Sequence, residues 1–292
     1  MKQFYYLWIS LRPKQWLKNL IIFAGILFAL KLSNLPLFIN TVYAFLLFCA
    51  VTSCIYLIND LKDMQNDKLH SSKKLRPLAS GALSPIIAKL FVIVALPFSL
   101  FFSYQLNVNF CYLVVAYIII MLGYTFGLKK IVILDAFIIA AGYVIRAVAG
   151  VEVIGVVFTP WFLVCAFLLA LFIVFCKRRN EILVLGENAV IHRLVFQEYN
   201  LQYLDQLISV VTAAIILTYS LYTLSSETVQ KFNTSNLIYT VPFVIFGLFR
   251  YLYLVYKKDE GGSAENLMLS DIPLIGAMFG WLFAVIVILY WR

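Results

Sequence analysis

Residues 37–67 read LFINTVYAFLLFCAVTSCIYLINDLKDMQND and hold the features that decide both the fold and the chemistry of this chain. The first part, 37–58, is an apolar run of the length that crosses a bilayer core as an α-helix, about 20 residues. The end of the stretch contains Asp60, Asp63 and Asp67. Residues three and four positions apart share one face of a helix, so the three carboxylates face one side. We therefore expect a membrane helix that ends in a cluster of acids.

The rest of the chain is just as apolar. Of its 292 residues, 63% are hydrophobic and only 13% are charged, which excludes a soluble globular domain. We expect an all-α, polytopic transmembrane bundle that forms a single integral-membrane domain over residues 1–292. The predicted spans lie near residues 17–35, 37–58, 86–106, 108–127, 131–150, 156–176, 207–225, 237–256 and 271–291.

The positions of the 23 Lys and Arg residues predict the orientation. With the N-terminus in the cytoplasm, nearly all of them fall on the inner side, as the positive-inside rule requires. Two longer connections, 59–85 and 177–206, then face the cytoplasm together with the acidic cluster. This topology, with attraction to anionic lipid, accounts for the net charge of +9. We expect the inner (plasma) membrane as the location and no nucleic-acid partner.

The acidic cluster suits a magnesium ion. Mg²⁺ binds through a few carboxylates, waters and substrate phosphates rather than in a cage made only of protein. The connection that follows the acids carries a basic run with Lys73 and Arg76. Cations beside Mg²⁺ ligands are the pairing that a diphosphate leaving group requires. Alone, the basic run would indicate a solvated surface beside the membrane, but next to three spaced aspartates it indicates a phosphate site.

A second polar group follows the fourth predicted span and consists of Tyr124, Lys129, Asp135 and Arg146. The spacing of Asp135, Gly142 and Arg146 places all three on one side of a helix. Charged side chains inside a membrane usually face the bundle interior or a watery cavity. Two interpretations stay open. In the first, Asp135 and Arg146 serve in a structural ion pair between helices. In the second, Asp135 completes the metal site and Arg146 holds a phosphate.

The pattern NDxxDxxxD at 59–67, followed by a YxxxxK stretch from Tyr124 to Lys129 and by Asp135, resembles the UbiA-type intramembrane prenyltransferases. The resemblance implies a helical bundle in which two acidic motifs and Mg²⁺ bind a diphosphate in a cavity open to the membrane. A second motif of the DxxxD kind would need an acid where this chain has Ile139. That difference argues against the aromatic acceptor of typical relatives.

Further segments resemble one branch of that family, the polyprenyl-phosphate phosphoribosyltransferases. They are RPKQWLKN at 12–19, the basic run at 70–77, residues 142–150, Lys177-Arg178 leading to Glu181, Arg250-Tyr251-Leu252 and GGSAE at 261–265. The resemblance implies transfer of a 5-phosphoribosyl group from phosphoribosyl pyrophosphate to a polyprenyl (decaprenyl-like) phosphate, with release of pyrophosphate. The acceptor is already an anion, so the reaction needs no general base. A long lipid acceptor also needs an apolar entry path, which an intramembrane bundle supplies.

On this basis, Asp60, Asp63 and Asp67 hold Mg²⁺ on the pyrophosphate. Asn59 is a neutral oxygen ligand or a sugar hydrogen-bond partner, and Asp135 joins the metal cluster or binds a ribose hydroxyl. The remaining substrate-binding candidates are Lys73, Arg76, Lys129 and Arg146 for donor phosphates, Lys14 and Lys18 for the lipid phosphate, Lys177 and Arg178 from the second connection, and Tyr124. For Lys14 and Lys18, ordinary anchoring at the membrane surface is an equal alternative, and for Lys177 and Arg178 a role in membrane topology alone is one.

Two other functions stay open. The first is a prenyltransferase that moves a polyprenyl group from its diphosphate to an aromatic acceptor with the same acids. The second is a non-enzymatic, ion-coupled carrier whose intramembrane acids bind and release ions. The abundance of phosphate-binding cations counts against the first. The second is disfavoured because the acids cluster at one face and the sequence shows no obvious repeat of broken helices in two halves. The sequence leaves the oligomeric state open, including a homo-oligomer.

Overall fold

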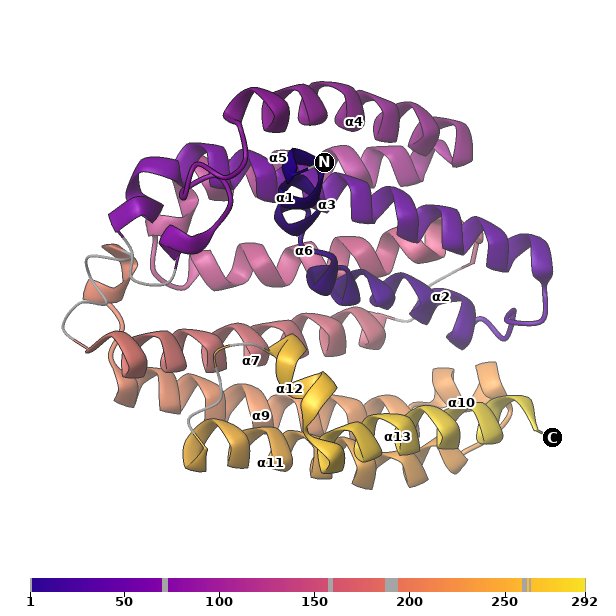
Figure 1. Cartoon of the computed structure of the whole chain (residues 1–292). Coiled ribbons are helices and arrows are strands. Elements are labelled where there is room, and N and C mark those ends of the chain that lie inside the picture. The colour runs from indigo at the N-terminus through magenta and orange to yellow at the C-terminus, as the bar shows by residue number, and fades with distance from the viewer. Residues whose placement is uncertain are drawn as a thin grey trace. The chain divides into compact units, whose positions relative to one another are not determined.

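The computed structural model describes residues 2–69, 73–156, 160–186, 194–258, 262 and 264–291. Within these residues every regular element is a helix, which confirms the all-α prediction (Figure 1). Eight helical segments there are long and apolar enough to cross a membrane. They lie in α3 (Leu35–Leu69), α4 (Pro85–Leu106), α5 (Val108–Phe126), α6 (Leu134–Glu152), α7 (Pro160–Leu185), α9 (Leu201–Leu224), η6 (Asn236–Thr240) joined to α11 (Val241–Lys257), and α13 (Ile272–Tyr290).

The chain forms two compact units, and α6 contributes residues to both. The first unit comprises Met1–Lys129 and Gly142–Val157, and the second comprises Lys130–Ala141 and Phe158–Arg292. Predicted features at 70–72, 187–193, 261 and 263 lie outside the described residues.

In the first unit, α3 packs on α4 and α5, and α4 packs on α5 (Figure 1). The core of this unit is aromatic. The Phe48 ring on α3 lies 5.7 Å from the ring of Phe110 and 5.6 Å from that of Tyr117, both on α5. Because lipid tails are as apolar as the side chains, such helices associate through close packing and interhelical hydrogen bonds rather than by burying apolar surface from water.

The predicted span at 17–35 has a different form from the one expected. Pro13–Ile22 is a 3₁₀ helix (η1), and Phe23–Phe28 is a short α-helix (α2). The segment packs closely on α6, since a Cβ on Gly150 would overlap the Ile22 carbonyl, and one on Gly25 would press on Val151 and on the Gly150–Val151 backbone. A 3₁₀ helix rises about 2 Å per residue and an α-helix about 1.5 Å, so the segment still reaches roughly 29 Å, near the bilayer core thickness.

The two connections are shorter than the sequence suggested. The helix α3 continues through the acidic motif to Leu69, and α7 continues through Lys177 and Arg178 to Leu185. Both extensions contain good helix formers, Leu, Lys, Met and Gln in α3 and Lys, Arg, Glu and Leu in α7, and neither contains Gly or Pro. The change from apolar to polar composition therefore marks the membrane surface rather than the end of the helix.

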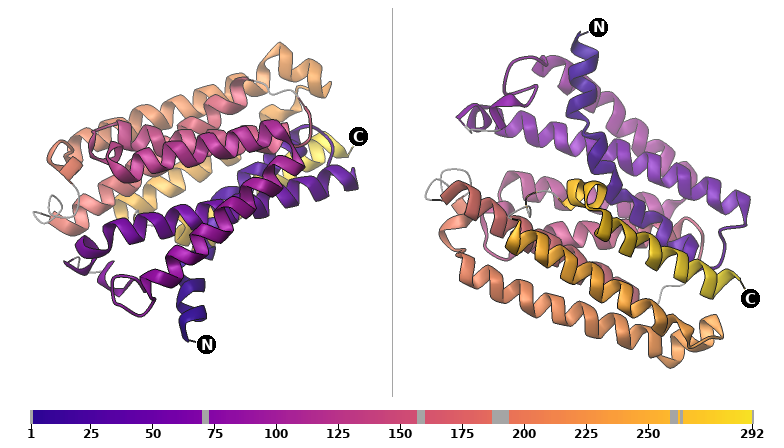
Figure 2. Two further views of the ribbon diagram at one scale, coloured as in Figure 1. Left: turned by 90° about the horizontal axis from the view of Figure 1, so that it is seen from above. Right: turned by 60° about the horizontal axis from the view of Figure 1, so that its bottom comes forward.

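A short helix that the sequence did not predict, α1 (Lys2–Ser10), precedes η1. In both views of Figure 2, α1 crosses the long helices of its unit at a steep angle instead of running along them. Its outer face exposes Phe4, Tyr5 and Trp8. Gln3 fastens it to the connection after α3, since its amide donates to the Ala82 carbonyl and accepts from the Ser84 amide, both at 3.0 Å. Exposed aromatic side chains on such a helix are typical of the membrane interface.

In the second unit, α7 packs on α9, and α11 packs on α13. Polar side chains add hydrogen bonds between these helices. The Trp281 indole donates to the Tyr219 hydroxyl, which in turn contacts the Thr240 hydroxyl, each at 2.7 Å. Arg250 and Asp271 form an ion pair at 2.8 Å beside the start of α13.

Candidate active site

The acidic motif occupies the polar end of α3, where Asp60 and Asp67 are buried and Asp63 is partly exposed. Each of the three carboxylates is paired with a cation of the chain. Asp63 accepts two hydrogen bonds, at 2.7 and 2.9 Å, from the Nζ of Lys129 on η3 (Leu128–Lys130). The structure thus brings Lys129, selected from the sequence as a phosphate ligand, to the first acidic motif.

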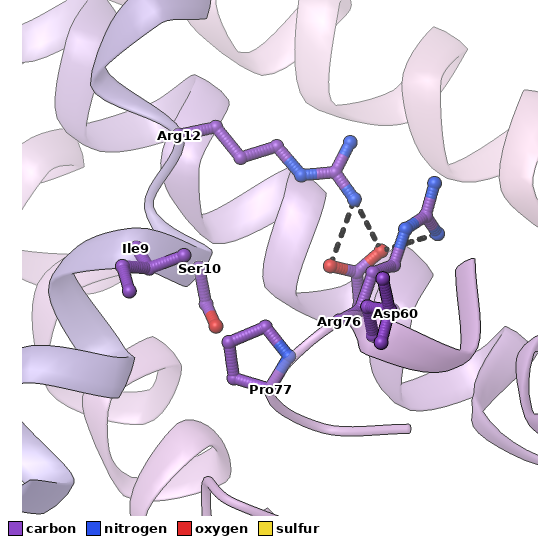
Figure 3. Close-up of a pocket in the computed structure, with 7 residues that line it drawn as sticks. Ile9, Ser10, Arg12, Asp60, Arg76 and Pro77 are labelled. Carbon is purple, nitrogen blue, oxygen red and sulfur yellow. Dashed lines mark hydrogen bonds and ion pairs between the residues drawn. The ribbon is translucent and has the colours of Figure 1, made fainter. Parts of the chain in front are cut away.

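Two arginines hold the other two carboxylates (Figure 3). Nη2 of Arg12 lies 2.6 and 2.8 Å from the two oxygens of Asp60. Nη1 of Arg76 lies 3.0 Å from Oδ1 of Asp60 and 2.7 Å from Oδ2 of Asp67, so one nitrogen bridges both acids. Arg76 was predicted as a site residue and Arg12 was not, although Arg12 belongs to the RPKQWLKN segment.

The backbone of Arg12 is unusual. Arg12 lies between α1 and η1 with φ 56° and ψ 61°, the left-handed region that residues with a Cβ occupy at a cost of about 1–2 kcal/mol. Its guanidinium also lies 4.9 Å from the centre of the Tyr56 ring. Strained residues of this kind are frequent at functional sites. The ion pair with Asp60 and the contact with Tyr56 offset the strain.

These arginines line a cavity of about 350 Å³. Figure 3 shows the Asp60 carboxylate between the guanidinium groups of Arg12 and Arg76. Ile9, Ser10, Leu75 and Pro77 complete the lining of the cavity. The cavity is therefore cationic toward Asp60 and mostly apolar toward α1 and the turn at Leu75.

The donor set of this site fits Mg²⁺. Asp60, Asp63 and Asp67 offer hard carboxylate oxygens, and two of these acids already share one cationic nitrogen. Among the residues that the structure describes, no three acidic, histidine or cysteine side chains converge into a group that could hold a metal ion by themselves. Mg²⁺ agrees with such an arrangement, because it takes only one or two carboxylates and completes its shell with water and substrate phosphate.

Arg146 lies deeper in the first unit and is buried. Its nitrogens donate to Oδ1 of Asn19 at 2.7 Å, to the Gly142 carbonyl at 2.8 Å and to the Tyr117 hydroxyl at 2.8 Å. Its guanidinium also lies 4.6 Å from the centre of the Tyr117 ring. In the described part of the chain, every partner of Arg146 is neutral, so the ion pair considered from the sequence is not formed there. Asn19 and Tyr117 were not predicted, and Arg146 joins η1, α5 and α6 through them.

Asp135 belongs to a buried network in the second unit. Its carboxylate accepts hydrogen bonds from Nε of Arg178 at 2.8 Å and from the Tyr199 hydroxyl at 2.9 Å. Arg178 also donates to Glu181 at 2.9 Å, and the Tyr199 hydroxyl accepts from the Ile133 amide at 2.8 Å. Burial and the negative charge of Asp135 raise the pKa of Tyr199 above its ordinary value, so this phenol stays protonated and donates.

This network changes how Arg178 is interpreted. The sequence suggested it as a phosphate ligand, but its side chain is 1% exposed and pairs with two carboxylates. Binding a phosphate would require breaking a buried ion pair. Tyr199 and Glu181 were not among the predicted site residues. Tyr199 has no sequence signal that connects it to Asp135, because the two are 64 positions apart.

The remaining predicted residues are distributed along both units. Asn59 precedes Asp60 on α3 and is partly exposed, and Lys73 opens the η2 turn (Lys73–Leu75) that leads to Arg76. On η1, Lys14 is exposed and Lys18 is partly exposed. Tyr124 lies near the end of α5 and Lys177 on α7, both partly exposed.

The model of the UbiA prenyltransferase family matches residues 19–283. The chain belongs to the UbiA prenyltransferase family. It is 32% identical over 287 residues to the decaprenyl-phosphate phosphoribosyltransferase of Corynebacterium glutamicum, which covers 96% of this chain and 86% of that protein. The enzyme of the same name from Mycolicibacterium smegmatis is 29% identical over 286 residues, or 94% of this chain and 89% of that one.

Solved structures of the UbiA family share the fold. The UbiA homolog from Archaeoglobus fulgidus bound to GPP and Mg²⁺ superposes with a TM-score of 0.72 at 22% identity, over 96% of this chain and 99% of that one. Membership in the UbiA prenyltransferase family makes this chain a transferase, and the family together with the apolar helices makes it a multi-pass membrane protein.

Proposed function

We propose that this UbiA-family transferase moves a 5-phosphoribosyl group from phosphoribosyl pyrophosphate to a polyprenyl (decaprenyl-like) phosphate, in a Mg²⁺-dependent reaction that releases pyrophosphate. One observation carries the proposal. Three carboxylates at the polar end of a membrane helix are each paired with a cation, and two of these cations line a cavity. The names of relatives that match 94–96% of the chain support the same reaction.

The charges of the site suit this chemistry. Departure of pyrophosphate from the anomeric carbon develops negative charge on the leaving oxygens and an oxocarbenium-like centre on the sugar. Held by carboxylates of the motif Asp60, Asp63 and Asp67 together with substrate phosphate, Mg²⁺ would neutralise charge on the leaving group. Arg76 and Lys129 donate to phosphate oxygens from positions beside the same acids.

The acceptor needs no general base from the protein, because its phosphate is already an anion. In the proposal Lys14 and Lys18 attract this phosphate at headgroup depth, and Asn59 binds the metal or a sugar hydroxyl. Asp135 is assigned to the metal cluster or to a ribose hydroxyl. The proposed location is the plasma membrane with the site facing the cytoplasm, where the charged, soluble sugar donor is present.

The aromatic-acceptor prenyltransferase is the second candidate, because the Archaeoglobus fulgidus homologs carry GPP or DMAPP. Those structures are 22% identical to this chain, and their likeness concerns the fold. The difference at Ile139 counts against this candidate. Membership in a transferase family counts against the ion-coupled carrier.

A transfer assay tests the proposal. The purified protein receives Mg²⁺, a polyprenyl phosphate and radiolabelled phosphoribosyl pyrophosphate, and label entering the organic phase is counted. We expect transfer that stops when the metal is chelated and in the Asp63→Asn variant. Glu227→Gln, which removes an exposed acid from α10 (Ser226–Phe232), should stay active. The proposal would be refuted in favour of the second candidate if the protein transferred no phosphoribosyl group but did transfer the prenyl group of a prenyl diphosphate to an aromatic acid.

A further inference from the structure

We infer that Arg12 is a phosphate-binding residue of this site and that its guanidinium exchanges Asp60 for a substrate phosphate when a divalent cation binds Asp60. The inference rests on the proposed function for the identity of the substrate, but its central claim concerns the charges in the cavity. Three observations support it: the exposure of the pair, the charge balance and the composition of the cavity wall.

The exposures of the two partners differ. The Asp60 side chain is 3% exposed and that of Arg12 is 26% exposed. Both line the cavity, so a molecule that enters it can reach the guanidinium more readily than the carboxylate. The guanidinium contacts both oxygens of Asp60 through Nη2 alone. Turned toward a phosphate, its planar fork can instead bind two oxygens of one group with two nitrogens.

The charges next to the cavity balance without a ligand. Arg12 and Arg76 carry two positive charges, and Asp60 and Asp67 carry two negative ones. A divalent cation on these acids competes with the guanidinium groups for the same oxygens and leaves an excess of two positive charges. A phosphate in the cavity removes that excess. Arg12 should therefore oppose the binding of a metal alone and favour the binding of a metal together with a phosphate.

The cavity wall indicates the chemical class of ligand. The cavity of about 350 Å³ is lined by Arg12 and Arg76 together with the apolar residues Ile9, Leu75 and Pro77. This lining accepts a phosphate group attached to a less polar body. Three parts of the proposed substrates share that chemistry: the pyrophosphate end of the donor, its 5-phosphate and the phosphate of the lipid.

The first arm of the test measures metal binding alone, with Mn²⁺ as a spectroscopic substitute for Mg²⁺. The full-length protein is compared with Arg12→Gln and with Lys89→Gln, which removes an exposed cation from α4 of the same unit. Because one competing cation is lost, Arg12→Gln should bind Mn²⁺ about threefold to tenfold more tightly. Lys89→Gln should match the unaltered protein. Unchanged or weaker Mn²⁺ binding in Arg12→Gln would overturn the exchange.

The second arm measures the binding of three anions at saturating Mg²⁺: inorganic pyrophosphate, phosphoribosyl pyrophosphate and a short-chain prenyl phosphate. Arg12→Gln should weaken at least one of them about tenfold or more, the loss of one charge-assisted pair. A loss shared by pyrophosphate and the donor assigns Arg12 to the leaving group. A loss of affinity for the donor alone assigns Arg12 to the 5-phosphate. A loss of affinity for the prenyl phosphate alone assigns Arg12 to the lipid phosphate. Unchanged affinity for all three would refute the inference.

A second variant separates binding from folding. Arg12→Lys keeps the charge beside Asp60 but loses the planar fork, so Mn²⁺ binding should stay near that of the unaltered protein while anion binding weakens. Unaltered anion affinity in this variant would also count against the inference, and gel filtration and thermal melting report whether each variant folds. Neither binding arm requires turnover. A protein that transfers no phosphoribosyl group but shows these opposite shifts would refute the proposed function and leave the role of Arg12 standing.

Discussion

Replacing Gly150 by alanine should destabilise the first unit and displace η1. A Cβ at this position would overlap the carbonyl of Ile22 and lie 2.8 Å from its Cα. Both obstacles are backbone atoms, so no side chain can rotate away, and η1 must move as a whole. Overpacking of a well-filled interior typically costs about 1–3 kcal/mol, and the fixed backbone on both sides places this change at the upper end of that range.

The assay is thermal melting of the purified protein in detergent, combined with Mn²⁺ affinity. Gly276→Ala is the matched control, because nothing lies within 4 Å of a Cβ at that position of α13. Alanine exceeds glycine in helix propensity by about 1 kcal/mol, so this control should melt at the same temperature or higher. Gly150→Ala should melt several degrees lower and change Mn²⁺ affinity, because η1 begins directly after Arg12. Equal melting temperatures for Gly150→Ala and the unaltered protein would refute the packing argument.

Three further predictions concern charged groups. Asp135→Asn removes the fully buried one of the two carboxylates that pair with Arg178 and should cost about 1–3 kcal/mol of stability, measured by thermal melting against Glu227→Gln. Lys129→Gln should lower kcat/KM about tenfold or more in the transfer assay while leaving the melting temperature nearly unchanged, because its pair with Asp63 is partly exposed. The hydrogen bond from Arg250 holds the pKa of Asp271 below its ordinary value, so this pair should stabilise the fold above about pH 4 and lose that effect as pH falls through the folded pKa. A melting temperature that falls as steeply between pH 5 and pH 3 in Asp271→Asn as in the unaltered protein would contradict this last prediction.

The sequence predicts much of this architecture because the physics of membranes is simple. A run of apolar residues about 20 long must form a helix in lipid, since each backbone polar group needs a partner within the segment. The spacing of Asp60, Asp63 and Asp67 then places the acids on one helix face, and the structure does bring Arg76 and Lys129 to them. Local periodicity decides the placement of the acids, and the chemistry of a diphosphate site, not periodicity, suggested cations beside them.

What the sequence could not reveal depends on contacts between distant segments. Arg12 and Asp60 are 48 positions apart in the sequence. Arg12 lies just before a proline and outside any helical repeat, so no spacing pattern in the sequence indicates its partner. The hydropathy of residues 13–22 does not distinguish the 3₁₀ helix η1 from an α-helix. The close approach of Gly150 to Ile22 is likewise seen only in the packed structure. The side-chain partners of Arg146, Asn19 and Tyr117, also lie on distant segments, so the sequence could not identify them.

The exposure of the cationic partner distinguishes ion pairs that can exchange from those that only support the fold. Arg12, Arg76 and Lys129 are 24–27% exposed, whereas Arg178 is 1% exposed. A fully buried partner can leave its carboxylate only at the full cost of an unpaired charge, so the pair of Asp135 and Arg178 is fixed. A partner that is one quarter exposed can turn toward a ligand, because water and the ligand replace what it gives up. The motif on α3 therefore combines three acids, two of them buried, with cations exposed enough to turn toward a ligand, which is the arrangement that the proposed anionic leaving group would require.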